Sequence, residues 1–190
     1  MTWRIFFVIN GFLTIPCITA LSLLIREKSR QWTGLFFFVL ILGYGGAILT
    51  CIEWMREYFT IKMMVSFFPQ GDRMYDVATE VAALPADPDF VWKFGGLGLW
   101  YILISYLGRK NRQLSKTAYA FGLLGGVCLI LAMIFGMTDT LIKFDNGMEL
   151  AVMQIPAAIG GAIGAPVFHF LAAKALFRRA KRTSKGSIKW

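Results

Sequence analysis

The sequence predicts an all-α integral membrane protein with five transmembrane helices. Two observations support this fold class. First, 57% of the 190 residues are hydrophobic and the mean hydropathy is +0.60, values outside the range of soluble globular domains. Second, the apolar residues are gathered into five long stretches without the polar face that a helix of a soluble bundle shows. Spans of about 20 residues would fill more than half of the chain, so we expect a single membrane domain over residues 1–190.

In chain order, the predicted spans are residues 5–25, 33–54, 91–107, 117–137 and 150–177. Only Arg4 precedes the first span as a basic residue, and no small-residue cleavage site follows it. We therefore expect this segment to be a retained span and not a secretory signal. Pro16 lies at its middle and predicts a kink. The third span is the shortest, and the fourth is rich in glycine.

Lys and Arg are divided unevenly among the connections between these spans. Fourteen of the twenty lie after the first span, after the third span, or in and just before the tail 178–190, whereas ten of the eleven Asp and Glu lie on the alternate side. Because basic loops resist translocation, this bias predicts an N-terminus outside and a C-terminus in the cytoplasm. The same flanking residues explain the net charge of +9 as contacts to the lipid bilayer, so no nucleic-acid partner is expected.

The largest connection is the external segment 55–90. Its first part, residues 55–68, either continues the helix of the second span or lies in the membrane interface. Pro69 then interrupts the segment, and Asp72 can cap a second short helix that ends near Leu84. We therefore expect a short external helical cap between the second and third spans.

Glycines spaced four apart form the clearest local pattern. Gly122 and Gly126 form one such pair in the fourth span, and Gly160 and Gly164 form another in the fifth, next to Gly161. Small residues at this spacing allow two helices to approach closely. Two interpretations follow: the glycines contact a partner protein or a second copy, or they pack the fourth and fifth spans against each other within one chain.

Polar residues within or beside the spans are the other candidates. Glu149, His169 and Asn10 form a possible polar pathway or switch, but the sequence favours a packed or interfacial histidine and a structural asparagine. Glu53 and Lys93 lie at the outer ends of their spans, where we expect water or lipid headgroups to reach them.

The residues expected of a metal, haem or redox centre are absent. The three cysteines, Cys17, Cys51 and Cys128, lie inside apolar segments without paired spacing, and one histidine cannot form a bis-histidine haem site. No phosphate-binding loop, nucleophile elbow or zinc pair occurs. We therefore expect no cofactor, no metal and no enzymatic activity; a membrane enzyme that acts on lipid ranks third among the functions considered.

Two functions remain from the sequence. The first is a non-enzymatic polytopic protein that contacts another integral membrane protein, in the manner of an accessory subunit or an immunity or exclusion protein. The second is a small permease or channel subunit that forms a homo-oligomer around a transport pathway. Compact connections and the lack of a glycosylation sequon favour the inner (cytoplasmic) membrane of a bacterium as the location.

Overall fold

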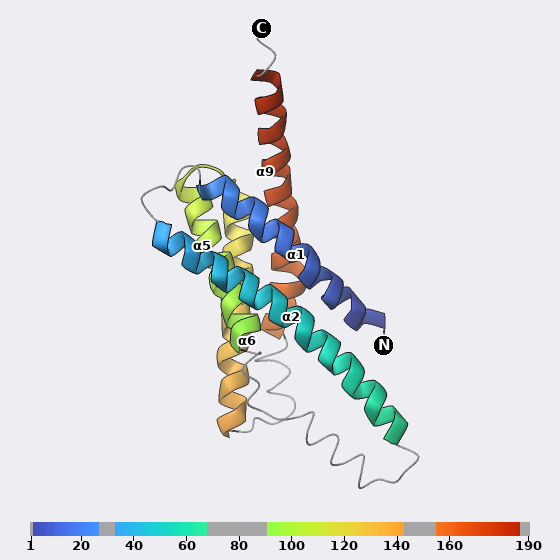
Figure 1. Ribbon diagram of the computed structural model, residues 1–190. Helices are drawn as coiled ribbons and strands as arrows, with labels where there is room; N and C mark the ends of the chain where they lie inside the picture. Colours follow the sequence, from blue (N-terminus) through green and yellow to red (C-terminus); the bar gives the residue numbers. More distant parts are fainter. Residues whose placement is uncertain (1, 27–32, 68–90, 143–154, 187–190) are drawn as a thin grey trace.

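A computed structural model describes residues 2–26, 33–67, 91–142 and 155–186, and every element in these ranges is helical (Figure 1). The elements are α1 (Thr2–Arg26), α2 (Thr33–Phe67), the π-helix η3 (Val91–Gly96), α5 (Leu97–Lys110), α6 (Lys116–Ile142), α8 (Ile155–Ala158), the π-helix η5 (Ile159–Gly164) and α9 (Ala165–Gly186). The prediction of an all-α protein is confirmed for this part of the chain.

Three helical stretches are long and apolar enough to cross a membrane. They are Gly34–Glu53 in α2, Lys116–Met137 in α6, and Ile155–Arg178 through α8, η5 and α9. Gly11–Ile25 in α1 is a shorter apolar stretch. These lengths are those of an integral membrane protein, whereas the count of five spans stays a prediction.

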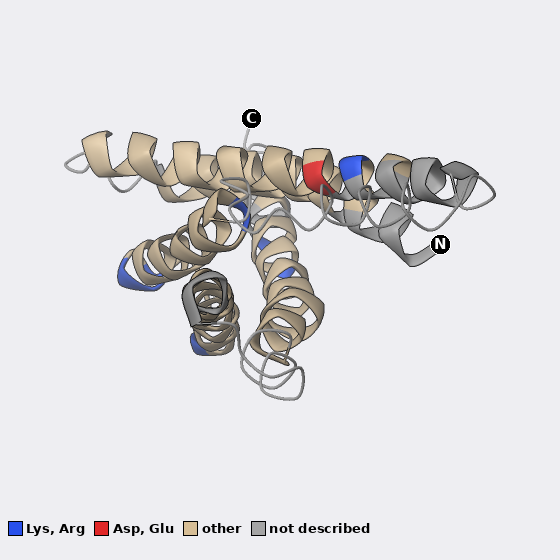
Figure 2. Cartoon of the chain, turned by 90° about the horizontal axis from the view of Figure 1, so that it is seen from below, with Lys and Arg blue, Asp and Glu red and all other residues tan. Residues whose placement is uncertain are grey.

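The helices form two layers. α1 and α2 lie side by side, and this pair crosses the face of a second group made of α5, α6 and α9 (Figures 1 and 2). α1 and α2 approach closely at Gly11, where a Cβ atom would lie 3.3 Å from the carbonyl oxygen of Ala47 and 2.5 Å from the sulfur of Cys51. The hydroxyl groups of Thr19 and Tyr44 also join the two helices, at 2.7 Å.

The hydrophobic core lies where the two layers meet. Trp100 from α5 and Phe168 from α9 are completely buried there, and Ile18 of α1 and Val39 of α2 belong to the same buried cluster. The rings of Trp100 and Phe168 meet edge to face with their centroids 6.2 Å apart. Burial of large aromatic and branched side chains from all of these helices holds the two layers together.

A short turn joins α5 to α6. The amide N–H groups of Asn111 and Gln113 donate to the carbonyl oxygens of Leu107 and Gly108, at 2.9 and 2.8 Å. Ser115 then caps α6, because its hydroxyl accepts the N–H of Ala118 at 3.1 Å. The turn is short, so α5 and α6 form an antiparallel hairpin at the end of the molecule beyond which α9 projects (Figure 1).

The last two helical segments form one continuous run with a π-helical part. In η5 the N–H of Ala165 donates to the carbonyl of Gly160, five residues earlier. Pro166 follows directly, and a proline ring inside a regular α-helix would clash with the carbonyl four residues before it. We attribute the wider turn to relief of this clash, eased by the lack of side chains on Gly160, Gly161 and Gly164.

The observed helices modify several predicted boundaries. α2 runs unbroken to Phe67, so the helical continuation of the second span is the alternative that the structure shows. At 35 residues, α2 is about 52 Å long and exceeds the hydrocarbon core of a bilayer, about 30 Å. The helix around Pro16 is also continuous. The predicted cap helix after Asp72 lies outside the described residues.

Candidate functional site

The two candidate glycines of the fourth predicted span, Gly122 and Gly126, face other helices of the same chain. A Cβ atom at Gly126 would lie 2.6 Å from the carbonyl oxygen of Gly98 in α5. At Gly122 it would overlap the hydroxyl of Ser105 in α5 and approach a ring carbon of Phe168 in α9 to 2.7 Å. Close packing of α6 against α5 and α9 therefore covers both positions, which leaves no open face there for a partner protein.

Two of the three glycines in η5 face α6. A Cβ atom at Gly164 would lie 2.6 Å from the Cα of Gly125, and one at Gly160 would lie 2.9 Å from the carbonyl oxygen of the same residue. Gly160 and Gly164 thus pack the last helical run on α6, as the packing interpretation expects. Gly161 differs, because no atom of the described residues lies within 4 Å of the place its Cβ would take.

Of the three polar candidates, only His169 has a described side chain. Asn10 lies in α1, and Glu149 lies outside the described residues. His169 lies in α9 and lines a cavity between α9 and α1. A pathway built from these three residues therefore stays a prediction, and only His169 has surroundings that can be described.

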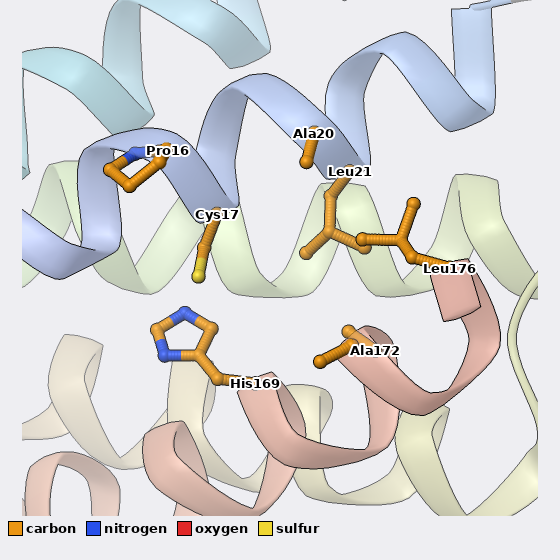
Figure 3. A pocket seen from close by; sticks show the side chains of 8 residues that line it. Pro16, Cys17, Ala20, Leu21, His169, Ala172 and Leu176 are labelled. Carbon is orange, nitrogen blue, oxygen red and sulfur yellow. The ribbon is translucent and has the colours of Figure 1, made fainter. Parts of the chain in front are cut away.

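The cavity has a volume of about 180 Å³ and is partly open at the surface of the chain. It is lined by Pro16, Cys17, Ala20 and Leu21 of α1 and by His169, Ala172, Ala173 and Leu176 of α9. Figure 3 shows the sulfur of Cys17 and the ring of His169 pointing toward each other from opposite walls. Small side chains on both helices leave the space, and two side chains with reactive or hydrogen-bonding atoms face it.

Aromatic residues of α5 and α9 hold His169 in place. Its Nε2 atom lies 3.2 Å from the hydroxyl of Tyr101, and the two rings have their centroids 5.6 Å apart. Trp100 and Phe168 lie on further sides of the ring, with centroid distances of 6.4 and 5.9 Å. The imidazole is therefore oriented by a hydrogen bond and by packing, so one rotamer is favoured.

A buried ion pair joins α2 to η3. The Nζ of Lys93 lies 2.5 Å from both carboxylate oxygens of Glu53, and both side chains are almost completely buried, at 8% and 11% exposure. The ammonium group also lies 4.4 Å from the centre of the Phe94 ring. The expectation that water or headgroups reach these two residues is therefore wrong.

The reason lies in the packing of two segments far apart in sequence. Gly46 of α2 lets η3 approach, since a Cβ there would lie 2.8 Å from the backbone N of Leu97 and 3.2 Å from the carbonyl of Trp92. Glu53 lies two helical turns after Gly46 in α2, and Lys93 directly follows Trp92 in η3, so the close approach of the two segments brings the pair within reach. In the sequence, Glu53 and Lys93 have opposite charges and lie at the outer ends of two predicted spans. This pattern allows an ion pair between them but does not specify one.

The cysteines and the acidic residues do not form a metal centre in the part of the chain that the structure describes. No group of three or more His, Cys, Asp and Glu side chains is close enough there to hold a metal ion. Cys17, Cys51 and Cys128 are free thiols, and Cys51 is buried between α1 and α2. The described side chains therefore offer packing surfaces, a cavity and a buried ion pair.

Comparison with known proteins gives no match among protein-family models, among curated proteins or among solved structures.

Proposed function

We propose that this protein is a non-enzymatic inner-membrane protein that binds another integral membrane protein through the outward face of its last helical run. The observation that carries the proposal is the contrast within η5. Gly160 and Gly164 are covered by α6, whereas Gly161 is open. Ala158 and Ala162 are exposed on either side of it along the helix. A face of small residues at membrane depth lets a helix of another protein approach closely.

The arrangement of the helices supports the orientation expected from the charges. The end of α1, the start of α2 and the turn between α5 and α6 lie at the same end of the molecule, where α9 projects (Figure 1). Arg109, Lys110, Arg112 and Lys116 lie in or beside that turn. In the proposed orientation this end faces the cytoplasm, which the rule for basic loops favours.

The test is purification of the tagged protein from its native membrane in a mild detergent, followed by size-exclusion chromatography and mass spectrometry. We expect one stoichiometric membrane-protein partner to co-purify with the wild type. Gly161→Ile places a bulky side chain on the open face and should remove the partner without changing the elution of the protein itself. Gly34→Ile is the matched control, because Gly34 also has no atom within 4 Å of its Cβ position but lies in α2.

Two outcomes would contradict the proposal. One is a partner that stays bound to Gly161→Ile, because the open face would then not be the contact. The other is equal loss of the partner from Gly161→Ile and Gly34→Ile, which would point to a general effect of a large side chain. Gly160→Ile is unsuitable for this test, since its side chain would meet the backbone of Gly125 and disturb the fold.

A transport role is the second candidate, favoured by polar side chains within the apolar stretches, namely His169 beside its cavity and the buried pair of Glu53 and Lys93. Charged groups inside membrane proteins often belong to ion or proton pathways, because their burial is costly. In this alternative, copies of the chain surround a pathway near η5, with Glu149 and His169 as polar lining. Reconstituted liposomes should then show flux that is lost in Glu149→Gln or His169→Ala while the proteins remain folded. Normal flux in both variants would exclude this pathway.

A further inference from the structure

The cavity between α1 and α9 has no part in the proposed partner contact, which lies on η5. Its walls belong to stretches that are apolar enough to lie within a bilayer, Gly11–Ile25 and Ile155–Arg178. In the membrane placement proposed above, on which this inference rests, an opening at this depth faces hydrocarbon and not water. A molecule that enters the cavity from outside the chain must therefore dissolve in lipid.

The lining combines apolar walls with a small number of polar atoms. Ala20 and Ala173 are only half buried and leave space on the two sides, while Leu21 and Leu176 supply apolar contact. The imidazole of His169 is the one polar side chain of the lining that can form strong hydrogen bonds. Binding sites for small molecules have this composition: a mainly apolar enclosure with a few oriented polar groups.

The hydrogen bond to Tyr101 orients the imidazole of His169, which can then bond to an oxygen atom of a molecule in the cavity. Two groups that can each donate and accept lie 3.2 Å apart, so a proton on one is matched by a lone pair on the other. Tyr101 is buried and does not line the cavity, whereas the His169 ring does, and among the described residues no second hydrogen-bond partner of that ring is found. A hydroxyl or a carbonyl on a bound molecule could therefore join the pair.

The volume limits the size of the molecule. An apolar cavity of about 150 Å³ in another protein holds one benzene molecule, and a water molecule occupies about 30 Å³. The 180 Å³ found here therefore matches a benzene ring with one small substituent. We infer that the cavity between α1 and α9 binds a lipid-soluble molecule through one six-membered ring that carries a hydroxyl or carbonyl oxygen, the chemistry shared by phenols and quinones.

The thiol of Cys17 provides a way to test this inference in the intact protein. Cys17 lines the cavity, so a bound molecule should slow its reaction with N-ethylmaleimide. Cys128 is a second half-buried thiol on α6, outside the cavity, and serves as the internal control in the same sample. Mass spectrometry of the two peptides gives both rates.

Phenol and toluene form a matched pair of probes. They have nearly the same size, but phenol carries a hydroxyl group where toluene carries a methyl group. We expect phenol to slow alkylation of Cys17 in a saturable manner at a concentration about fivefold lower than toluene, the effect of one net hydrogen bond. The rate at Cys128 should not change. Cyclohexanone, a six-membered ring with one carbonyl oxygen, is close to phenol in size and tests the carbonyl form: protection by cyclohexanone but not by phenol would favour a carbonyl ligand, and the reverse a phenol.

Two kinds of variant distinguish the contribution of the apolar cavity to binding from that of the hydrogen bond to His169. His169→Leu should equalise the effects of phenol and toluene, whereas Ala20→Leu and Ala173→Leu should fill the space and abolish protection by both. Two filling variants are used because one of them could fail to fold, which size-exclusion chromatography would reveal. The inference is overturned if phenol and toluene protect equally in the wild type, if Cys128 slows in parallel with Cys17, or if a folded filling variant is still protected.

Discussion

Loss of one member of the pair Glu53–Lys93 should strongly destabilise the protein. The two side chains are 8–11% exposed and lie 2.5 Å apart, so water has little access to either charge. Removal of one partner from a buried pair costs about 3–5 kcal/mol, compared with about 0–1 kcal/mol for a pair exposed to water. We therefore expect Glu53→Gln and Lys93→Met each to lower the free energy of unfolding by about 3 kcal/mol.

The double variant gives the sharper result. Replacement of both charges by Met removes the desolvation cost together with the attraction, so the double variant should be within about 1 kcal/mol of the wild type. The wild type, the two single variants and the double variant form a double-mutant cycle. Its coupling energy would then be several kcal/mol, as expected for two residues in direct contact. Unfolding in a titration of SDS against mild detergent, followed by tryptophan fluorescence, measures all four proteins. Single variants that each cost less than about 1 kcal/mol would refute the reasoning, because the pair would then be solvated.

Two further predictions concern α6 and its neighbours, measured by the same unfolding assay. Gly164→Ala should destabilise by about 1–3 kcal/mol, since the new methyl group meets the backbone of Gly125 at 2.6 Å, whereas Gly161→Ala should be neutral or stabilise by about 0.5 kcal/mol. Equal effects of the two substitutions would contradict the observed packing. Ser105→Ala should stabilise by about 1 kcal/mol, because the hydroxyl is buried and finds no hydrogen-bond partner among the described residues; a clear loss of stability would show that this hydroxyl is bonded.

The helical fold class could be predicted from the sequence because the bilayer imposes it. Every backbone polar group in hydrocarbon needs an internal partner, so a long apolar stretch such as residues 117–137 can only become a helix. The observed α6, Lys116–Ile142, contains that range and extends it at both ends. The apolar stretch of the last span ends at Arg178, next to the predicted end at residue 177, and α9 continues beyond it as a basic helix to Gly186.

The candidate site was predicted only in part. Spacing identified Gly122, Gly126, Gly160 and Gly164 as helix contacts, but it could not distinguish a contact within the chain from one between proteins. His169 was singled out for its chemistry, whereas Cys17, from a helix 152 residues away, was expected to be a buried hydrophobe. The cavity depends on how α1 crosses α9, which no local pattern encodes.

The sequence by itself determined the membrane class and the charge asymmetry, because both depend on the free energy of transfer of individual residues between water and lipid. The tertiary structure alone decided which glycines are covered, that Glu53 and Lys93 are buried together, and that Cys17 faces His169. These features arise from close approach of helices that are distant in the chain. Such an approach depends on the shapes of both surfaces at once, and therefore on the packed structure as a whole.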